Sequence, residues 1–363
     1  MNADFADLAA RWVAALPAAL VRATISASHV VRLRANEVPW QATGVRLKAG
    51  QAYSLFASGR VQWSPRDPSL YGGPRQHLCA RIVPGGRVVN PPCDTGTFVA
   101  DVDGELELGI YMGVWKNALG DLSTPESLYR RLTGGIAVLA IAWCGDAAQA
   151  LAVLDDGPLQ PPLISQEIAR LRAPRAPPAD WDYLLETGSA GIFSDAFGPS
   201  GEPTIAVDAR DDQGIVCAPV SCELNPRTRL SWRWRVSECP SNLAEDRAQT
   251  HDYISIATEF DNGRDLTWIW SSQLAPETHF DCPIHAWTAR ETHWVVRSGN
   301  ERLGQWCSEE RNVYADVQTA MGAPAARIVR VWLIALSSFQ HGTARAEFSD
   351  IVLSDGSQSF RVL

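Results

Sequence analysis

The stretch that most constrains the fold of this chain is residues 230–236, which read Leu-Ser-Trp-Arg-Trp-Arg-Val. Large apolar side chains alternate with polar ones, so Trp232 and Trp234 fall on one face of an extended strand, and Arg233 and Arg235 fall on the other. One apolar face and one polar face are typical of a half-buried β-strand. We therefore interpret the two tryptophans as core residues and expect any ligand on the Arg face.

A second strand is predicted over residues 253–260, where apolar side chains alternate with Ser255 and Glu259. If the two strands are neighbours in one sheet, Arg233, Arg235 and Glu259 share a polar sheet face. Guanidinium groups on such a face could hold the hydroxyls or carboxylates of a ligand. The alternative is a solvated outer face whose cross-strand ion pairs contribute little energy.

Composition places the chain among ordinary globular proteins. Its 363 residues suffice for two domains, and its net charge of −9 argues against a nucleic-acid partner or an anionic membrane bound through bulk charge. The unusual figure is 14 Trp against 3 Met. Aromatic residues suit the core of a β-sandwich, and they also suit stacking platforms for sugar rings, so both roles stay open.

The order of segments predicts an all-β fold: two tandem β-sandwich, jelly-roll-like domains with a short N-terminal helix. Apolar residues at helical spacing open the chain, short strand patterns separated by Gly-rich turns follow, and a Pro-rich stretch divides the strands into two sets. The predicted segments are an amphipathic helix at 1–23, a first sandwich at 24–155, a linker at 156–180 and a second sandwich at 181–363. The helix is expected to pack on the first domain, with a homodimer contact as the alternative.

The cysteines and the N-terminus bear on the compartment. None of the eight Cys forms a Cys-x-x-Cys pair, and no Cys/His spacing fits a zinc motif. The N-terminal residues carry no basic cluster ahead of an apolar run and no convincing cleavage site, so we do not expect a signal peptide. The sequence contains no run of 18 apolar residues, so it predicts no membrane-spanning helix. We expect a cytoplasmic protein with reduced thiols.

The first half carries motifs of a known lectin family. These are Trp40, the Leu47-x-x-Gly50 turn, and residues 57–61, 97–100 and 104–111. On these motifs, residues 36–143 resemble the PA-I-type galactophilic lectins, which are small β-sandwiches. The resemblance implies a calcium ion that bridges protein and sugar at the sandwich tip. In the corresponding loop, Asn117, Asp121 and Thr124 could supply oxygen ligands. Gly113 stands near the position where the resemblance implies an Asp ligand.

The second half carries a different set of motifs: residues 230–236, 251–256, 268–270, 295–299, 304–306, 311–316 and 348–351. On these, residues 182–356 resemble a bacterial family known as domain of unknown function 3047. The resemblance implies a concanavalin-like or galactose-binding-like sandwich and no established reaction. The closing strand is also similar to the last strand of jelly-roll carbohydrate-binding modules, which makes Asp350 a candidate ligand for a structural calcium ion. The alternative is an Asp at a bulge.

Candidate site residues come from both halves. Ligand-binding candidates in the second domain are Arg233, Arg235, Glu259, Trp270, Trp306 and Arg311. Those in the first domain are Trp63, Tyr71 and His77, from a long irregular stretch of the kind that often carries function. Catalytic candidates are His251, Asp252 and Glu259, since an Asp–His pair can act as a general base.

A metal could also bind in the loop that holds Cys282. His279, Asp281 and His285 are its neighbours there, but the spacing does not fix three ligands on one side. Further along, Asn312 is expected to cap a short helix.

The function that this pattern predicts is recognition of a carbohydrate or glycoconjugate, with a sugar as partner and a structural calcium ion as the one cofactor considered. The alternative is an enzyme of the hydrolase or lyase class that acts on a carbohydrate in the second domain. A third possibility is a structural or interaction protein without a small ligand. Convergence of Asp252, Glu259 and Arg233 on one pocket would favour the enzyme, and burial of every Trp would argue against sugar binding.

Overall fold

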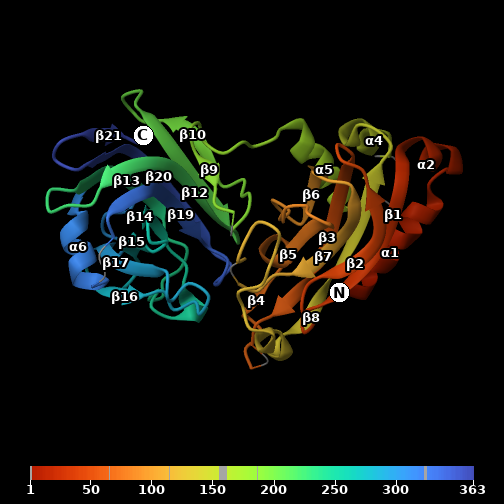
Figure 1. Ribbon diagram of the computed structural model, residues 1–363, viewed down its shortest axis with the longest axis horizontal. Helices are drawn as coiled ribbons and strands as arrows, with labels where there is room; N and C mark the ends of the chain where they lie inside the picture. Colours follow the sequence, from red (N-terminus) through yellow and green to blue (C-terminus); the bar gives the residue numbers. More distant parts are fainter. Residues whose placement is uncertain (1, 65, 114, 155–161, 186, 323–324) are drawn as a thin grey trace. The chain divides into compact units, whose positions relative to one another are not determined.

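A computed structural model of the protein describes residues 2–64, 66–113, 115–154, 162–185, 187–322 and 325–363. The chain divides into two compact units, residues 1–175 and 176–363 (Figure 1). Each unit contains its own hydrophobic core. The first part of the predicted linker, residues 156–161, lies outside the described residues.

The N-terminal unit is a sandwich of two antiparallel sheets, named here after their central strands. The β8 sheet has the order β1 (Ile25–Arg34), β8 (Thr133–Trp143), β3 (Ala52–Gln62) and β4 (Tyr71–Gly72), with β6 (Thr95–Val99) also beside β3. The β7 sheet has the order β2 (Gln41–Leu47), β7 (Gly104–Ile110) and β5 (Leu78–Val83). Short helical turns, α3 (Pro74–His77) and η1 (Glu126–Arg131), lie in the connections. Alternating side chains such as Leu55 and Leu108 fill the space between the sheets.

Helices cover the other face of the β8 sheet. α1 (Asn2–Ala15), α4 (Ala147–Leu154) and α5 (Pro162–Arg172) contribute to a second apolar cluster that includes Trp12, Phe56 and Ile141. Strand β8 is therefore covered on both sides, which explains its nearly continuous apolar sequence. The sequence predicted one helix over residues 1–23, but Pro17 separates α1 from α2 (Ala18–Thr24) because proline cannot continue the backbone hydrogen-bond ladder.

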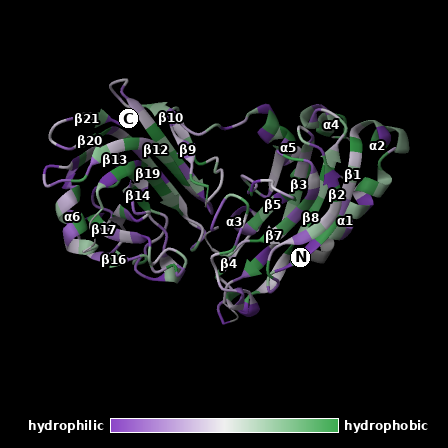
Figure 2. Cartoon of the chain, in the orientation of Figure 1, coloured by the Kyte–Doolittle hydropathy of each residue, from purple (hydrophilic) through white to green (hydrophobic). Residues whose placement is uncertain are grey.

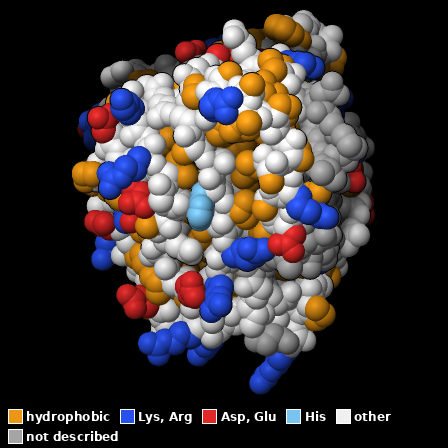
Figure 3. All heavy atoms as spheres, turned by 90° about the vertical axis from the view of Figure 1, so that its right-hand side faces the viewer, with side chains coloured by type: hydrophobic (Ala, Val, Ile, Leu, Met, Phe, Trp, Pro, Cys, Tyr) orange, Lys and Arg blue, Asp and Glu red, His pale blue; other side chains and the backbone are white. Residues whose placement is uncertain are grey.

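The apolar face of α1 is used inside its own unit. Ala9 and Trp12 are buried against the sheet, as expected for a helix that packs on the first domain. Figure 3 shows this side of the unit, where hydrophobic side chains lie among basic and acidic ones. The homodimer contact through this helix stays a prediction.

The C-terminal unit is also a sandwich. Its β13 sheet has the order β10 (Phe193–Phe197), β11 (Pro203–Arg210), β20 (Thr343–Ser354), β13 (Arg229–Glu238) and β18 (Cys307–Asn312), with β21 (Ser359–Arg361) beside β20. Its β14 sheet has the order β16 (His279–Asp281), β17 (Glu291–Ser298), β15 (Asp265–Ser271), β14 (Ile254–Phe260), β19 (Arg327–Leu336), β12 (Gln213–Glu223) and β9 (Asp182–Tyr183). Neighbouring strands run antiparallel, whereas β15 and β17 run parallel. Two short helical segments complete the unit, η2 (Ala248–Thr250) and α6 (Val313–Ala320).

Tryptophans from both sheets meet in the core of this unit. Trp232 and Trp234 are buried as predicted; Trp232 lies 6.0 Å from Trp268, and Trp234 lies 5.5 Å from Trp270, between ring centroids. Edge-to-face and tilted contacts of this kind suit the charge distribution of aromatic rings. Strand β19 is apolar on both faces and central in its sheet, as its sequence predicted. Figure 2 shows apolar residues recurring along the strands.

One prediction about the sheets is wrong. The strand of Arg233 and Arg235 (β13) and the strand of Glu259 (β14) lie in opposite sheets, so the three side chains share no face. Period-2 alternation tells which side of a strand faces the core but not which sheet the strand joins. The segment between β13 and β14 crosses from one layer of the sandwich to the other.

Two further observations concern the whole described chain. No helix among the described residues is long and apolar enough to cross a membrane. The eight cysteines all fall within the described ranges, and none of them is in a disulfide bond.

Candidate functional site

The outer face of the β13 sheet carries the predicted Arg residues around an indole ring. Arg235 forms an ion pair with Glu347, which lies directly opposite it on β20, and Arg233 pairs with Asp350 at 3.3 Å. Trp306, half-buried just before β18, lies next to both guanidinium groups, whose carbons are 5.1 Å (Arg233) and 5.5 Å (Arg235) from the ring centroid. We call these five residues the Trp306 face.

A bulge explains how Asp350 reaches this face. The register between β13 and β20 shifts beside Arg233, and Asp350 adopts a positive φ of 50°. Its carboxylate lies near Arg233 and, at 3.8 Å, near Arg361. Calcium needs six to eight oxygen ligands, whereas these partners of Asp350 are cations, so its surroundings do not resemble the predicted calcium site.

The other ligand-binding candidates of this unit lie elsewhere. Glu259 pairs with Arg330 at 2.9 Å on the outer side of the β14 sheet. Trp270 is only 2% exposed and belongs to the core, so the prediction that it supplies a sugar platform is wrong. Arg311 binds Asp316 at 2.8 Å at the start of α6, next to Asn312, which caps that helix as predicted. Of the predicted set, the structure therefore brings together Arg233, Arg235 and Trp306.

The catalytic candidates do not converge either. The Asp252 carboxylate accepts the backbone N–H groups of Phe339 (3.0 Å) and Gln340 (2.7 Å), so it holds a loop in place. Burial raises the pKa of this carboxyl to about 6. Because Asp252 faces that loop and Glu259 and Arg233 lie on different sheets, the predicted arrangement for an enzyme is not present among these residues.

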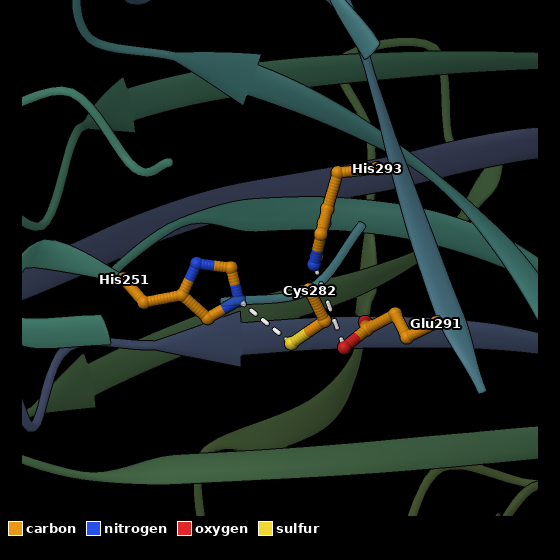
Figure 4. A group of neighbouring side chains, drawn as sticks. All are labelled: His251, Cys282, Glu291 and His293. Atoms are coloured by element: carbon orange, nitrogen blue, oxygen red, sulfur yellow. Dashed lines mark hydrogen bonds and ion pairs between the residues drawn. The ribbon is translucent and has the colours of Figure 1, made fainter. Parts of the chain in front are cut away.

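His251 belongs to a buried polar cluster on the outer side of the β14 sheet, the side that faces away from the sandwich core. With Cys282, Glu291 and His293 it forms a group in which one candidate ligand atom of each residue lies within 4.8 Å of all the others (Figure 4). Burial lowers the pKa of His251 to about 3, so its ring is neutral. The cluster lies among apolar side chains that include Tyr253, Phe280 and Trp287.

The residues that the sequence suggested as metal ligands near Cys282 do not join it in this cluster. His279 is exposed and stacks on Trp294 at 4.9 Å, while Asp281 and His285 are also exposed. Instead, Cys282 faces His251, which precedes it by 31 residues, at 3.4 Å. No pattern in the sequence joins these two segments, because only the fold places them side by side.

Glu291 and His293 were missed by sequence reasoning. They occupy alternate positions at the start of β17, so both side chains point to the same face of the strand. That face is buried, with Glu291 4% and His293 0% exposed. A Glu-x-His pair on the face of a strand that also carries the apolar Val295 was the signal that could have found them.

Among the candidates of the N-terminal unit, Trp63 and His77 contact each other, whereas Tyr71 contacts Arg60. The Trp63 indole N–H donates to His77 Nε2 at 2.8 Å, and His77 Nδ1 lies 3.0 Å from the carbonyl oxygen of Tyr111. Tyr71 lies under the guanidinium of Arg60, 4.0 Å from the ring centroid. His77 is buried, so its polar atoms contact protein and do not face solvent.

The predicted calcium loop of this unit closes on itself. Asn117 donates to the Asp121 carboxylate at 2.8 Å, and its own side-chain oxygen accepts the Leu119 backbone N–H at 3.0 Å. Thr124, in contrast, is buried. The oxygens of Asn117 and Asp121 thus stabilise a turn in this structure.

An open groove of about 590 Å³ also lies in this unit, along β1 and β2. It is lined by Arg32, Arg34, Glu37, Val38, Trp40, Gln41 and Ala42. The Trp40 ring already stacks on Trp115 at 5.1 Å and contacts the Arg81 guanidinium at 4.5 Å. The groove therefore offers mainly polar groups to a ligand.

Comparison with known proteins finds a family model that matches part of the chain. Residues 196–352 match the model of a family described as protein of unknown function (DUF3047). This match confirms the resemblance of the second half that its motifs indicated. No curated protein matches the chain.

Several solved structures are similar to parts of the chain. A structure described as the EclA N-terminal domain, a PllA-like lectin, is 18% identical with a TM-score of 0.26, covering 33% of this chain and 98% of that one. The xyloglucanase domain of NopAA from Sinorhizobium fredii is 9% identical with a TM-score of 0.29, covering 45% and 86%. A family 30 carbohydrate-binding module of Clostridium thermocellum is 9% identical with a TM-score of 0.27, covering 49% and 88%.

Proposed function

We propose that this protein binds a carbohydrate on the Trp306 face of its C-terminal unit. The observation that carries the proposal is a half-buried indole ring in contact with two guanidinium groups on the outer face of a sheet. An indole offers a flat apolar surface, and the C–H faces of a sugar ring are flat and apolar too. Polar groups beside an aromatic surface are the usual means by which a binding site orients its ligand.

The exposure of the tryptophans narrows the choice, and Trp306 differs from Trp287 in having two guanidinium groups against its ring where Trp287 has that of Arg290. Within the described ranges, ten of the 14 Trp are buried, and Trp40, Trp63, Trp287 and Trp306 are half-buried. The Trp63 indole N–H is bonded to His77, and Trp40 is stacked on Trp115. Trp306 combines partial exposure with ionised side chains on two neighbouring strands, β13 and β20.

The charge balance of the Trp306 face favours an uncharged sugar. Arg233 lies beside Asp350, and Arg235 lies beside Glu347, so each guanidinium is matched by a carboxylate. Such pairs supply both donors and acceptors for hydroxyl groups without a strong net field for a polyanion. We therefore expect binding that changes little with ionic strength.

The test is a glycan array on the full-length protein, followed by calorimetry with a sugar that binds. Trp306→Ala should lower the affinity at least about tenfold, as expected for an aromatic anchor. Trp287→Ala is the matched control, because Trp287 is also half-buried beneath a guanidinium, that of Arg290 at 5.0 Å, but lies in the turn between β16 and β17, away from the β13 sheet. Absence of any glycan signal, or an equal loss in both variants, would refute the proposal.

A second arm of the same experiment compares binding with added calcium and with a chelator. Sugar binding on the Trp306 face should not depend on calcium, since the charged partners of Asp350 there are the cations Arg233 and Arg361. Binding that requires calcium would instead point to the lectin-like loop of Asn117 and Asp121 and would count against the Trp306 face.

A further inference from the structure

The buried cluster of His251, Cys282, Glu291 and His293 has the composition of a metal site (Figure 4). We propose that these four side chains bind one zinc ion in the C-terminal unit. Imidazole nitrogen, thiolate sulfur and carboxylate oxygen are the ligand atoms that zinc takes in proteins, usually four in number.

The distances fit a tetrahedral ion. Ligand atoms at about 2.0–2.3 Å from zinc stand roughly 3.3–3.8 Å apart at the corners of a tetrahedron. His251 Nε2 lies 3.4 Å from Cys282 Sγ, and His293 Nε2 lies 3.5 Å from Glu291 Oε2. Since the four ligand atoms all lie within 4.8 Å of one another, small side-chain adjustments suffice to centre an ion between them.

Neighbouring groups already orient the ligands. His251 Nδ1 lies 2.6 Å from the carbonyl oxygen of Glu245, and a carbonyl can only accept, so Nδ1 carries the proton and Nε2 presents its lone pair to Cys282. Glu291 Oε1 accepts hydrogen bonds from Tyr253 (3.1 Å) and Thr267 (3.3 Å), while Oε2 faces His293. Such outer partners fix the orientation of metal-binding imidazoles and carboxylates.

His293 supplies an independent sign that a ligand is expected. Its side chain is 0% exposed, and apart from the 3.5 Å contact of Nε2 with Glu291 neither ring nitrogen has a hydrogen-bond partner among the described residues. The ring stacks on Phe280 at 5.1 Å and meets His251 edge-on at 4.7 Å, so it is held toward the cluster. Buried polar atoms left without a partner cost stability, and a bond to zinc would satisfy one of these nitrogens.

The ligand set favours zinc over the hard cations. Calcium and magnesium take oxygen ligands, whereas a set of two imidazoles, one thiolate and one carboxylate suits zinc. The thiolate of Cys282 and the carboxylate of Glu291 together balance the charge of a divalent ion, which a buried site requires.

The site is structural in character. Its four ligands are at most 4% exposed, and four protein ligands complete a tetrahedral shell without a position for a substrate. Zinc there would tie β17 to the segment after β16 and to the segment before β14, which carry Cys282 and His251. Its expected effect is therefore on the stability of the β14 sheet and of the residues that cover it.

The test uses the full-length protein. After loading with zinc and dialysis, elemental analysis should find one zinc ion per chain, and replacement by cobalt should give the absorption of a tetrahedral site with a thiolate-to-metal charge-transfer band. Cys282→Ser should abolish that band and lower the zinc affinity at least about 100-fold. Loss of a group that only hydrogen-bonds a metal ligand costs about 10- to 100-fold, and loss of a ligand itself should cost at least as much. Cys307→Ser, at a buried thiol on β18, is the matched control and should change neither.

A second pair of variants separates the cluster from the exposed histidines nearby. His293→Gln should lose zinc, and His285→Gln should keep it, because His285 is exposed and outside the cluster. If Cys282→Ser or His293→Gln does not fold, the cobalt spectrum of the unmodified protein decides, since a charge-transfer band requires a bound thiolate. A loaded protein without stoichiometric zinc, a cobalt form without that band, or equal zinc loss in His285→Gln would overturn the proposal.

Discussion

His77 should make the N-terminal unit sensitive to acid. An indole N–H can only donate, so His77 Nε2 must accept from Trp63, and Nδ1–H must donate to the Tyr111 carbonyl oxygen. This arrangement requires the neutral ring, because a proton on Nε2 would face the indole N–H. Burial lowers the pKa of His77 from 6.5 to about 4.

The magnitude follows from the difference between the folded and unfolded states. Above pH 6.5 His77 is neutral in both states, so its full contribution to stability is present. As the pH falls from 6.5 to about 4, His77 binds a proton in the unfolded chain but not in the folded chain. Proton binding therefore stabilises the unfolded state relative to the folded state. The shift amounts to a loss of about 3 kcal/mol in the free energy of unfolding once the pH is below the folded pKa.

The measurement is hydrogen exchange with mass spectrometry on the full-length protein, read from peptides of β3 and β5 between about pH 7 and pH 4, with rates corrected for intrinsic exchange. His77→Gln retains an acceptor for Trp63 but cannot titrate, so the acid-induced loss of protection should be smaller by about 3 kcal/mol. His29→Gln, at an exposed position of β1, is the control and should behave as the unmodified protein does. If protection in His77→Gln falls with pH as steeply as in the unmodified protein, the reasoning is refuted.

Three further variants test other parts of the structure. Glu167→Ala removes a buried carboxylate that accepts hydrogen bonds from Thr97 and Arg170 at 2.6 Å each. The free energy of unfolding, measured by urea titration, should fall by roughly 1–3 kcal/mol, and an unchanged value would contradict this role. Trp232→Ala empties a core position that is 1% exposed and should cost roughly 3–5 kcal/mol by the same assay, whereas a loss below about 1 kcal/mol would argue against the packing described. Tyr253→Phe removes the hydrogen bond to Glu291 and should weaken zinc binding about 10- to 100-fold in competition titrations, and unaltered affinity would speak against that orienting contact.

The sequence predicted local structure better than it predicted neighbours. Alternation alone identified Trp232 and Trp234 as core residues, and apolar residues on both faces identified β19 as a covered central strand. Both inferences use only the direction of side chains along one strand, which the backbone geometry fixes. The pairing of Arg233 with Glu259 required knowing which strands share a sheet, and no local pattern carries that information.

The same limit applies to the candidate sites. Alternation along the strand marks Arg233 and Arg235 as an outer face, but only the fold shows that β18, which Trp306 precedes, is the neighbour of β13. The members of the buried cluster come from separate segments, and β17, which carries His293, joins the sheet through a parallel pairing with β15. Parallel neighbours need a long connection, so their register cannot be deduced from a turn.

The two sheets of the C-terminal unit separate the two proposed sites. The Trp306 face is open: the side chains of Arg233 and Asp350 are 37% and 41% exposed. The cluster around His293 is closed, because apolar residues such as Phe280 cover the outer side of the β14 sheet. The tryptophan core lies between the two sheets, so no ligand at Trp306 can contact the zinc site. Removal of zinc should therefore lower the stability of the unit while leaving the contacts of the Trp306 face intact in the molecules that remain folded, which keeps the tests of the two proposals independent.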